Sequence, residues 1–460
     1  MGSLAASEIH YPDASDSSLI LAHPTDAEKE QTWRLNHGEW GGPLDQPAYM
    51  QREQVLASTE LTANGGMVHW ILTEPSLQHG QDNDKGKKRN VLASCETIRK
   101  RVLYVLPSSS PQAGDEGEVR EGVSYGIGSV YTYPEFRGRK YAARMLTDLG
   151  VLLKTWPGEE QLRQKRAVSK SDRQQQAEPQ EAVCSALWSD IGKRFYASKG
   201  WPAFTSEHVE FPASLSSSTP GIASLFEWSE SSHRTLLTLT PIDEHNLAAL
   251  CAEDDCQLRR ELTRHARKTG RTAFAFAPDA DVFRWHWARE EFIYSQVFPG
   301  QDASNVKGMV ATVARKGGSR EKSAARMWAI WTRNYGADAA ADPAKNTLYI
   351  LRLVIDDSCM PPPGHFEPDD EAPQLAFNAI MHSALDAART WHCGSVHLWN
   401  PTPVVRGLID RCGLAHKSVD REVDSIPSMM WYGPEGEREE GEEKGKEAVD
   451  WIANEKYCWC

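Results

Sequence analysis

The sequence contains no run of 18 apolar residues, so none of its segments is expected to span a membrane. Its first ten residues, MGSLAASEIH, lack both the basic region and the apolar region of a secretion signal. Ala6 stands where an N-myristoylation site that begins at Gly2 needs Ser or Thr. These absences predict a cytoplasmic protein that neither enters nor binds a membrane.

Positive charge is scarce in the chain as a whole. Lys and Arg number 51 against 64 Asp and Glu, which gives a formal net charge of −13. Such an acidic balance excludes a broad surface for nucleic acid or for anionic lipid. Any basic patch must therefore be local, and the partner expected is a small molecule. The sequence makes no prediction of the oligomeric state.

Cysteine spacings typical of zinc sites are also missing. The nine cysteines are scattered and odd in number, and the closest pairs are Cys251 with Cys256 and Cys458 with Cys460. The segment HCGSVH (392–397) brings two histidines and a cysteine together, but a helix end followed by a strand is the preferred explanation. We therefore predict no metal site, and reduced thiols of the kind found in the cytosol.

The chain does contain enough ordinary globular sequence for two domains, with 460 residues of which 40% are hydrophobic and 25% charged. Residues 1–212 predict a strand, two helices, three strands, a helix, a strand, a helix and a strand, which is a mixed α/β domain. Residues 213–240 are typical of a linker. Residues 241–434 repeat the strand–helix–strand–helix–strand plan in a second α/β domain, and 435–460 predict an acidic flexible tail.

One short segment, SVYTYPEFRGRKYAARML (129–146), concentrates positive charge. It joins a predicted strand to a predicted helix, and Arg137, Arg139 and Lys140 surround Gly138 at the junction. The first turn of a helix has unpaired N–H groups and partial positive charge, and glycine lets a ligand approach the backbone. The segment therefore predicts an anion-binding loop, although a charged turn that only solvates the helix start has the same composition.

Two motifs resemble those of the GNAT superfamily of acetyl-CoA-dependent acetyltransferases. In the loop, Arg137 and Ala142 match the pattern [RQ]-x-x-G-x-[GA], while Lys140 replaces the central glycine. Further along, SDIGKRFYASKGW resembles N-x-x-A-x-x-x-Y-x-x-x-G-[FW], with Tyr196 at the tyrosine and Ser189 at the asparagine. The resemblance implies a GNAT fold followed by a second GNAT-like α/β domain, with acetyl-CoA as co-substrate and no metal.

The resemblance also assigns the residues that contact acetyl-CoA. The backbone of 129–131 is expected beside the pantetheine, and the basic loop with the start of the helix is expected to hold the pyrophosphate. The full set is Ser129, Val130, Tyr131, Arg137, Gly138, Arg139, Lys140, Tyr141, Ala142, Ala143 and Ser189.

Within the superfamily, the chain most resembles the fungal lysine N6-acetyltransferases, through SCETIRKRV, LWSDIGKRFYASKGW and SIPSMMWYG as well as the basic loop. This resemblance implies acetyl transfer to the N6 amine of free L-lysine. Two other functions fit the same residues: N-acetylation of proteins or peptides, and binding of CoA without turnover. A large second domain favours the first function, because it can close over a small acceptor.

Acetyl transfer to an amine needs a base for the ammonium, donors for the oxyanion and an acid for the thiolate. By resemblance Tyr196 is the acid, although a tyrosine packed in the core has the same pattern. Glu96, a carboxylate in an apolar strand, is the favoured base, with Glu135 and Tyr133 as alternatives. Candidates for binding the α-amino group of the acceptor are Asp356, Asp357, Ser425 and Ser428, of which the two aspartates are more typical of a turn.

Overall fold

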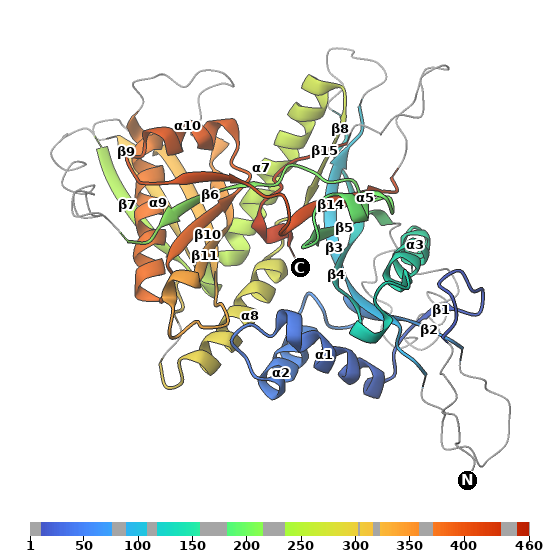
Figure 1. Cartoon of the computed structure of the whole chain (residues 1–460). Helices are drawn as coiled ribbons and strands as arrows, with labels where there is room; N and C mark the ends of the chain where they lie inside the picture. Colours follow the sequence, from blue (N-terminus) through green and yellow to red (C-terminus); the bar gives the residue numbers. More distant parts are fainter. Residues whose placement is uncertain are drawn as a thin grey trace, which may run out of the picture.

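The computed structural model describes residues 11–75, 89–107, 117–156, 182–214, 235–301, 304–315, 323–357, 371–433 and 449–459. Two mixed β-sheets with helices packed on them form the molecule (Figure 1), so the predicted mixed α/β class is confirmed. The polar insertions, most of the predicted linker and the first part of the predicted tail lie outside the described residues.

The first sheet follows the order β1-β2-β3-β4-β5-β14, and β8 adds to it by pairing with both β3 and β15. Its strands are β1 Ile20–Ala22, β2 Met67–Thr73, β3 Ala93–Val105, β4 Arg120–Thr132, β5 Ala182–Ser189, β8 Thr272–Phe276, β14 Ile426–Trp431 and β15 Val449–Trp451. Long strands rich in Val, Ile and Tyr account for its centre, since such side chains pack well on a pleated surface.

The second sheet follows the order β13-β6-β12-β11-β10-β9-β7. Its strands are β6 Glu207–Pro212, β7 Thr235–Ile242, β9 Gly308–Arg315, β10 Ser323–Asn334, β11 Thr347–Ile355, β12 Ser395–Trp399 and β13 Lys417–Asp420. In each sheet three antiparallel strands lead through a helix to a parallel strand, as β2-β3-β4-α3-β5 and as β9-β10-β11-α9-β12. The predicted repetition of plan between the halves is therefore present.

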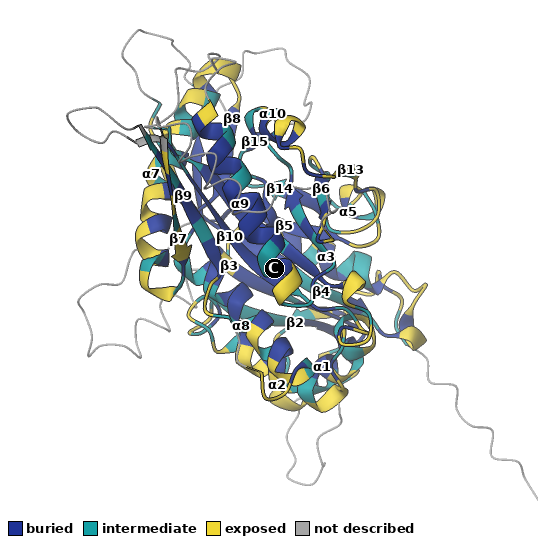
Figure 2. Cartoon of the chain, turned by 90° about the vertical axis from the view of Figure 1, so that its left-hand side faces the viewer, coloured by how far each residue is buried: buried dark blue, intermediate teal, exposed yellow. Residues whose placement is uncertain are grey.

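The helices pack their apolar faces on these sheets and leave their outer faces exposed (Figure 2). They are α1 Asp26–Trp40, α2 Gln46–Ala57, α3 Tyr141–Leu153, α5 Arg194–Ala197, α7 Glu244–Thr269, α8 Ala280–Val297, α9 Glu371–Thr390 and α10 Pro403–Arg411. Helix α1 begins with a capping box, in which the Thr25 side chain accepts from the Glu28 N–H and Glu28 accepts from the Thr25 N–H. Helix α5 is shorter than the sequence predicts, because Gly192 takes a φ of 78° and holds the preceding residues in a loop.

The two halves of the chain exchange strands. Strand β6, the last strand of the predicted first domain, pairs with β12 and β13 in the second sheet. Strand β14, from the other half, pairs with β5 in the first sheet. Each exchanged strand supplies hydrogen-bond partners to an edge that would otherwise be open. A boundary at residue 212 therefore does not separate two structural units, and that prediction needs correction.

The prediction of a flexible tail over 435–460 is wrong for its last part. Strand β15 pairs in parallel with β8, and Tyr457 and Cys458 are fully buried. Tyr457 donates a hydrogen bond to the Phe276 carbonyl at 2.7 Å, and the Lys100 ammonium donates to the Cys458 carbonyl at 2.8 Å. The aromatic area buried by this last segment outweighs the charge of the sequence around it.

Candidate functional site

Strands β4 and β5 part before they end. Their last paired residues are Ile127 and Leu187, whereas β4 continues to Thr132 and β5 to Ser189. We call this parting, between residues 128–132 and 188–189, the first fork. Beyond the last pair, backbone groups on one edge of β4 have no partner in β5, so they are available to a ligand at the carboxyl ends of two parallel strands.

A β-bulge lies in β4 at the start of the first fork. The register between β3 and β4 shifts there, with Gly128 opposite Glu96 but Tyr131 opposite Ser94. Ser129 adopts a φ of 51°, in the left-handed region that a non-glycine residue adopts only at a cost of about 1–2 kcal/mol. A bulge turns a backbone N–H out of the ladder, which is the geometry needed to hold an oxyanion or an amide of a ligand.

The predicted basic loop stands between β4 and α3, as expected. Gly138 has a φ of 81°, and an added Cβ there would meet open space. Lys140 has a φ of 68° and is the N-cap of α3, without a side-chain cap hydrogen bond. The N–H groups of the first helical turn are thus left for an external acceptor. The left-handed backbone also explains why glycine suits the position of Lys140.

The side chains of this loop divide into two groups. Arg137 is half exposed, donates to the Thr132 carbonyl at 3.1 Å and pairs with Glu39 at 3.1 Å. The Arg139 guanidinium lies 5.5 Å from the centre of the Tyr11 ring. Tyr141, however, turns into the core and donates to the Pro12 carbonyl at 2.6 Å, so only its backbone can contribute to anion binding.

The other predicted cofactor contacts lie in the first fork or in the first turn of α3. Val130 is partly buried, and Tyr131 is buried with its ring 5.4 Å from the Arg137 guanidinium. Ala142 and Ala143 are half-buried in the first turn of α3, where their small side chains leave the backbone accessible. The Ser189 hydroxyl donates to the Gly192 carbonyl at 2.7 Å, which leaves it no free proton for a ligand.

A small, narrow cavity opens beside the bulge. Its lining comes from the loop before α1, from α1 and from strands β2, β3 and β4: Pro24, Thr32, Trp33, Asn36, His69, Trp70, Ser94, Cys95, Glu96 and Ser129. The Asn36 Oδ1 and Trp33 Nε1 atoms are buried there without hydrogen-bond partners. Buried polar atoms of this kind are costly unless a ligand or water satisfies them, so the cavity is suited to a polar ligand.

Glu96 is the carboxylate of this cavity. Its Oε1 accepts a hydrogen bond from the Ser129 hydroxyl at 2.9 Å, and its Oε2 lies 3.6 Å from His69 Nδ1. Burial raises the pKa of Glu96 above its ordinary value, although the Ser129 hydrogen bond and the charge of Arg52 oppose the shift. Burial also lowers the pKa of His69 to about 4, so the imidazole beside Glu96 is neutral.

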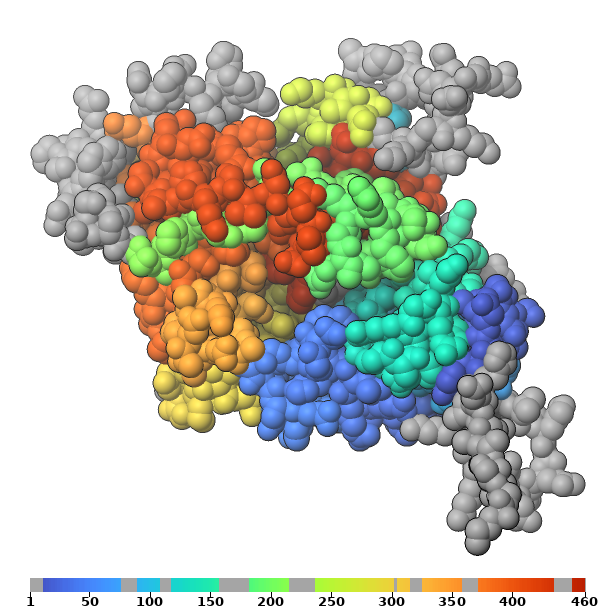
Figure 3. Space-filling view, in the orientation of Figure 1, coloured from blue at the N-terminus to red at the C-terminus, as the bar shows by residue number. Residues whose placement is uncertain are grey.

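A second buried carboxylate, Glu53 on α2, lies close enough to interact electrostatically with Glu96. Arg52 Nε donates to Glu53 Oε1 at 2.9 Å, and burial followed by the charge of Glu96 raises the Glu53 pKa. Sequence reasoning missed Glu53, His69, Trp33 and Asn36. His69, Trp33 and Asn36 reach the cavity from β2 and α1, and no short motif marks their approach to β3. Figure 3 shows the surface of the N-terminal helices (blue) beside that of α3 (turquoise).

Tyr196, the predicted acid, is 8% exposed and lies in the core cluster beneath the first sheet. Burial raises its pKa above the ordinary value, with smaller contributions from Asp190 and Cys95. The phenol is therefore protonated at neutral pH, as a proton donor must be. Cys95 and Glu96 line the cavity, whereas Tyr196 is not among the residues that line it.

The alternative candidates are less well placed. Glu135 is exposed in the turn before the basic loop, and the buried Tyr133 hydroxyl has no hydrogen-bond partner. Asp357 is paired with Arg260 at 2.8 Å and Asp356 with Arg326 at 3.2 Å, both in the second half of the chain. The two serines lie on the side of β5 where β14 pairs with it. The Ser425 N–H donates to Asp190 Oδ1, and the Ser428 hydroxyl donates to the Ile426 carbonyl.

The second sheet has an equivalent fork, and the chain itself fills it. Strands β11 and β12 part after Ile350 and Leu398, and β11 is bulged at the next residue. There the Leu353 N–H donates to Glu455 Oε2 at 2.9 Å, and Arg352 pairs with Glu455 and with Asp254. The C-terminal segment thus occupies the position that is open in the first sheet.

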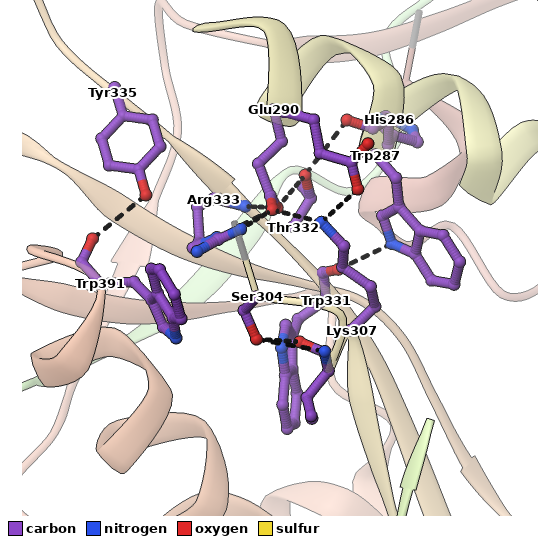
Figure 4. Close-up of polar contacts among 12 residues, drawn as sticks. His286, Trp287, Glu290, Ser304, Lys307, Trp331, Thr332, Arg333, Tyr335 and Trp391 are labelled. Atoms are coloured by element: carbon purple, nitrogen blue, oxygen red, sulfur yellow. Dashed lines mark hydrogen bonds and ion pairs between the residues drawn. The ribbon is translucent and has the colours of Figure 1, made fainter. Parts of the chain in front are cut away.

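The second half also holds a buried ionic cluster around Glu290, shown in Figure 4. Glu290 accepts from Lys307 at 2.8 Å, from the Thr332 hydroxyl at 3.0 Å and from the Arg333 N–H at 2.6 Å. Donors from β10 and from the residue before β9 thus saturate this carboxylate of α8. This cluster therefore holds elements together and offers no acceptor to a ligand.

Known proteins resemble the chain in both halves. Residues 224–460 match the family described as "LYC1 GNAT-like C-terminal domain". The "Uncharacterized protein YGR111W" of Saccharomyces cerevisiae is 24% identical over 301 residues, which are 62% of this chain and 66% of that protein. A "Lysine acetyltransferase" of Yarrowia lipolytica is 24% identical over 455 residues, covering 94% of this chain and 97% of that protein.

Among solved structures, a probable N-acyltransferase from Enterococcus faecalis matches with a TM-score of 0.43 and 11% identity, over 90% of this chain and 73% of that one. A tandem GNAT protein from the clavulanic acid biosynthesis pathway matches with a TM-score of 0.39 and 10% identity, over 90% of this chain and 98% of that one. Within the described ranges, every helix is too short or too polar to cross a bilayer. Because the family match covers more than half of the 460 residues, the chain belongs to the LYC1-like family of GNAT-type acetyltransferases.

Proposed function

We propose that the protein transfers the acetyl group of acetyl-CoA to the N6 amine of free L-lysine. The observation that carries this proposal is the cavity beside the first fork, which joins a buried carboxylate, Glu96, to the bulged backbone at Ser129. The similarity to the Yarrowia lipolytica lysine acetyltransferase over nearly the whole chain supports lysine as the acceptor. Buried Asn36 and Trp33 atoms without partners suit a small polar acceptor.

Acetyl-CoA fits the first fork in charge and in shape. The open N–H groups at the start of α3, together with Arg137, Arg139 and Lys140, suit the pyrophosphate. The free edge of 128–132 suits the amides of the pantetheine arm, which would then run along the strand toward the bulge. Of the predicted contacts, Tyr141 contributes through its backbone alone, because its side chain is in the core.

The reaction needs four events at this site. Glu96 takes a proton from the lysine ammonium, and the neutral amine attacks the thioester carbon. A backbone N–H at the bulge stabilises the resulting oxyanion. Collapse of the tetrahedral intermediate breaks the carbon–sulfur bond, and Tyr196 gives its proton to the departing thiolate. The product nitrogen loses its excess proton, and the cycle closes when Glu96 gives up a proton to solvent and the tyrosinate regains one.

Replacing Lys140 tests whether its charge or its backbone matters. Lys140→Gly and Lys140→Asn both tolerate a positive φ, so each is expected to raise the free energy of unfolding by about 1 kcal/mol. Loss of the cation is expected to raise the KM for acetyl-CoA by about tenfold, the effect of about 1.4 kcal/mol. Steady-state kinetics and thermal unfolding measure the two effects, with Lys140→Arg as control. An unchanged KM in both variants shows that the cation does not contact the cofactor.

Replacing Tyr196 with Phe removes the proposed acid without removing the ring from the core. The CoA thiolate is a weak base, since a thiol has a pKa of about 8.5, so we expect kcat to fall by only about 10- to 100-fold. Steady-state kinetics with acetyl-CoA and lysine measure this fall. Unchanged turnover assigns Tyr196 to packing alone.

The proposal as a whole is tested by thiol release from acetyl-CoA with a panel of acceptors. The panel contains free L-lysine, other amino acids, polyamines and lysine-containing peptides. Turnover with free lysine, and N6-acetyllysine as the product by mass spectrometry, is the expected result. Turnover confined to peptides makes the protein a peptide acetyltransferase instead. Retained CoA binding, measured as thermal stabilisation, without turnover on any acceptor shows a CoA-binding protein that does not catalyse transfer.

A further inference from the structure

Three possible metal ligands come together on the second sheet, the sheet that does not carry the first fork. His208 and Glu210 are two residues apart on β6, so their side chains share one face of the strand. His397 on β12 lies directly opposite Glu210 in the antiparallel register. One ligand atom of each of these residues lies within 4.8 Å of the others.

One carboxylate oxygen, Glu210 Oε1, lies near a ring nitrogen of each histidine. Glu210 Oε1 lies 3.0 Å from His208 Nε2 and 4.0 Å from His397 Nε2. A tetrahedral ion with bonds of about 2.1 Å separates its donor atoms by about 3.4 Å, a value between the two observed distances. The other oxygen, Oε2, is held by Lys417 Nζ at 2.6 Å, so Oε1 can turn to an ion without breaking that pair.

An ion would replace the present hydrogen bonds of the cluster, in which His208 Nε2 lies 3.0 Å from Glu210 Oε1 and His397 Nε2 lies 3.1 Å from the Ser395 hydroxyl. His208 is 7% exposed, and its Nδ1 is buried without a hydrogen-bond partner. The His208 and His397 rings stack with centroids 4.7 Å apart, so one ring must turn before both imidazole nitrogens can point at the same ion. The Glu210 side chain is 22% exposed and that of His397 is 15% exposed, which leaves a path for an ion and for a water ligand.

We propose that His208, Glu210 and His397 bind one divalent transition-metal ion of the zinc class, with water completing the coordination. Two imidazoles and one carboxylate are the donor set of such ions, whereas Mg²⁺ and Ca²⁺ prefer oxygen ligands alone. The ion would join β6, which comes from the first half of the chain, to β12 of the second half. Its binding therefore stabilises the exchanged strand. The segment HCGSVH contributes only His397, because His392 stacks on Phe298 instead.

The first test is zinc binding by the full-length protein after treatment with a chelator. Isothermal titration is expected to give one ion per chain, and zinc is expected to raise the melting temperature, since an ion that binds only the folded state stabilises it. His397→Ala removes a ligand and is expected to weaken zinc binding by at least about 100-fold. Loss of a residue that only orients a ligand already costs about 10- to 100-fold. His416→Ala, outside the cluster, is the matched control and is expected to bind as the wild type does.

Two further measurements keep the test decisive. Lys417→Gln removes the competing cation and is expected to tighten zinc binding severalfold. The visible spectrum of the wild type with Co²⁺ needs no variant: intense bands indicate a tetrahedral site, and the weak bands of the aqueous ion indicate none. Absence of stoichiometric binding of either ion overturns the proposal. Equal binding by His397→Ala and His416→Ala, with both variants folded by circular dichroism, overturns it as well.

Discussion

Replacing Glu96 with Gln is expected to lower kcat by about 10²- to 10⁴-fold, the contribution of a general base that takes a proton in the rate-limiting step. The amide keeps the shape of the side chain and can still accept from the Ser129 hydroxyl, which now bonds Glu96 Oε1 at 2.9 Å. It cannot take a proton from the lysine ammonium. Steady-state kinetics with acetyl-CoA and lysine from pH 5 to pH 10 measure the effect.

The pH profile separates this base from the substrate. Burial raises the pKa of Glu96, so the wild-type rate is expected to rise with pH through a value above that of an ordinary carboxyl group. Glu96→Gln is expected to lose this limb and to keep the limb of the amine, whose pKa is about 10.4. Glu135→Gln, in the exposed turn before the basic loop, is the control and is expected to leave the rate within about twofold. A Glu96→Gln enzyme with the wild-type profile disproves the assignment.

The same shift predicts that this variant folds well. A carboxyl whose folded-state pKa is raised contributes stability at pH values below its unfolded pKa, and that contribution is lost as the pH rises through the folded pKa. At neutral pH and above, a charged Glu96 therefore costs stability, and the neutral amide does not. The melting temperature of Glu96→Gln is expected to equal or exceed that of the wild type at pH 8, so lost activity cannot be attributed to unfolding.

Ending the chain after residue 448 is expected to prevent stable folding. The truncation removes the buried side chains of Trp451 and Tyr457, and loss of a buried aromatic side chain costs about 3–5 kcal/mol each. It also removes Glu455, which leaves the buried Arg352 with Asp254 as its remaining carboxylate partner. The total approaches the whole free energy of unfolding of a typical domain, about 5–15 kcal/mol.

Thermal unfolding and soluble yield measure the effect of this truncation. Tyr457→Phe is the matched control: it loses the hydrogen bond to the Phe276 carbonyl but keeps the packed ring, so it is expected to cost only about 1 kcal/mol. A truncated protein that melts within about 2 °C of the full-length chain contradicts the role of this segment. It also contradicts the inference that Glu455 fills the second fork.

Local features of the fold and of the site could be predicted from the sequence, because they depend on neighbours along the chain. The basic loop is an example: a strand, three cations around a glycine and an amphipathic helix identify a helix start that can hold an anion. The pattern also placed Lys140 at the glycine position, where the backbone does adopt a φ of 68°. Glu96 stood out as a carboxylate in an apolar strand, and it does line the cavity.

Long-range pairing decided the rest. The exchange of β6 and β14 depends on which sheet edge is open, as does the burial of Tyr457 against the Phe276 strand. The lining of the cavity by α1, and the meeting of His208 with His397, likewise join residues far apart in sequence. Hydrophobic periodicity and composition predict one strand or helix at a time, and they do not predict which other element it pairs with. The partner follows from the hydrogen bonds and apolar area that only the assembled sheets can satisfy.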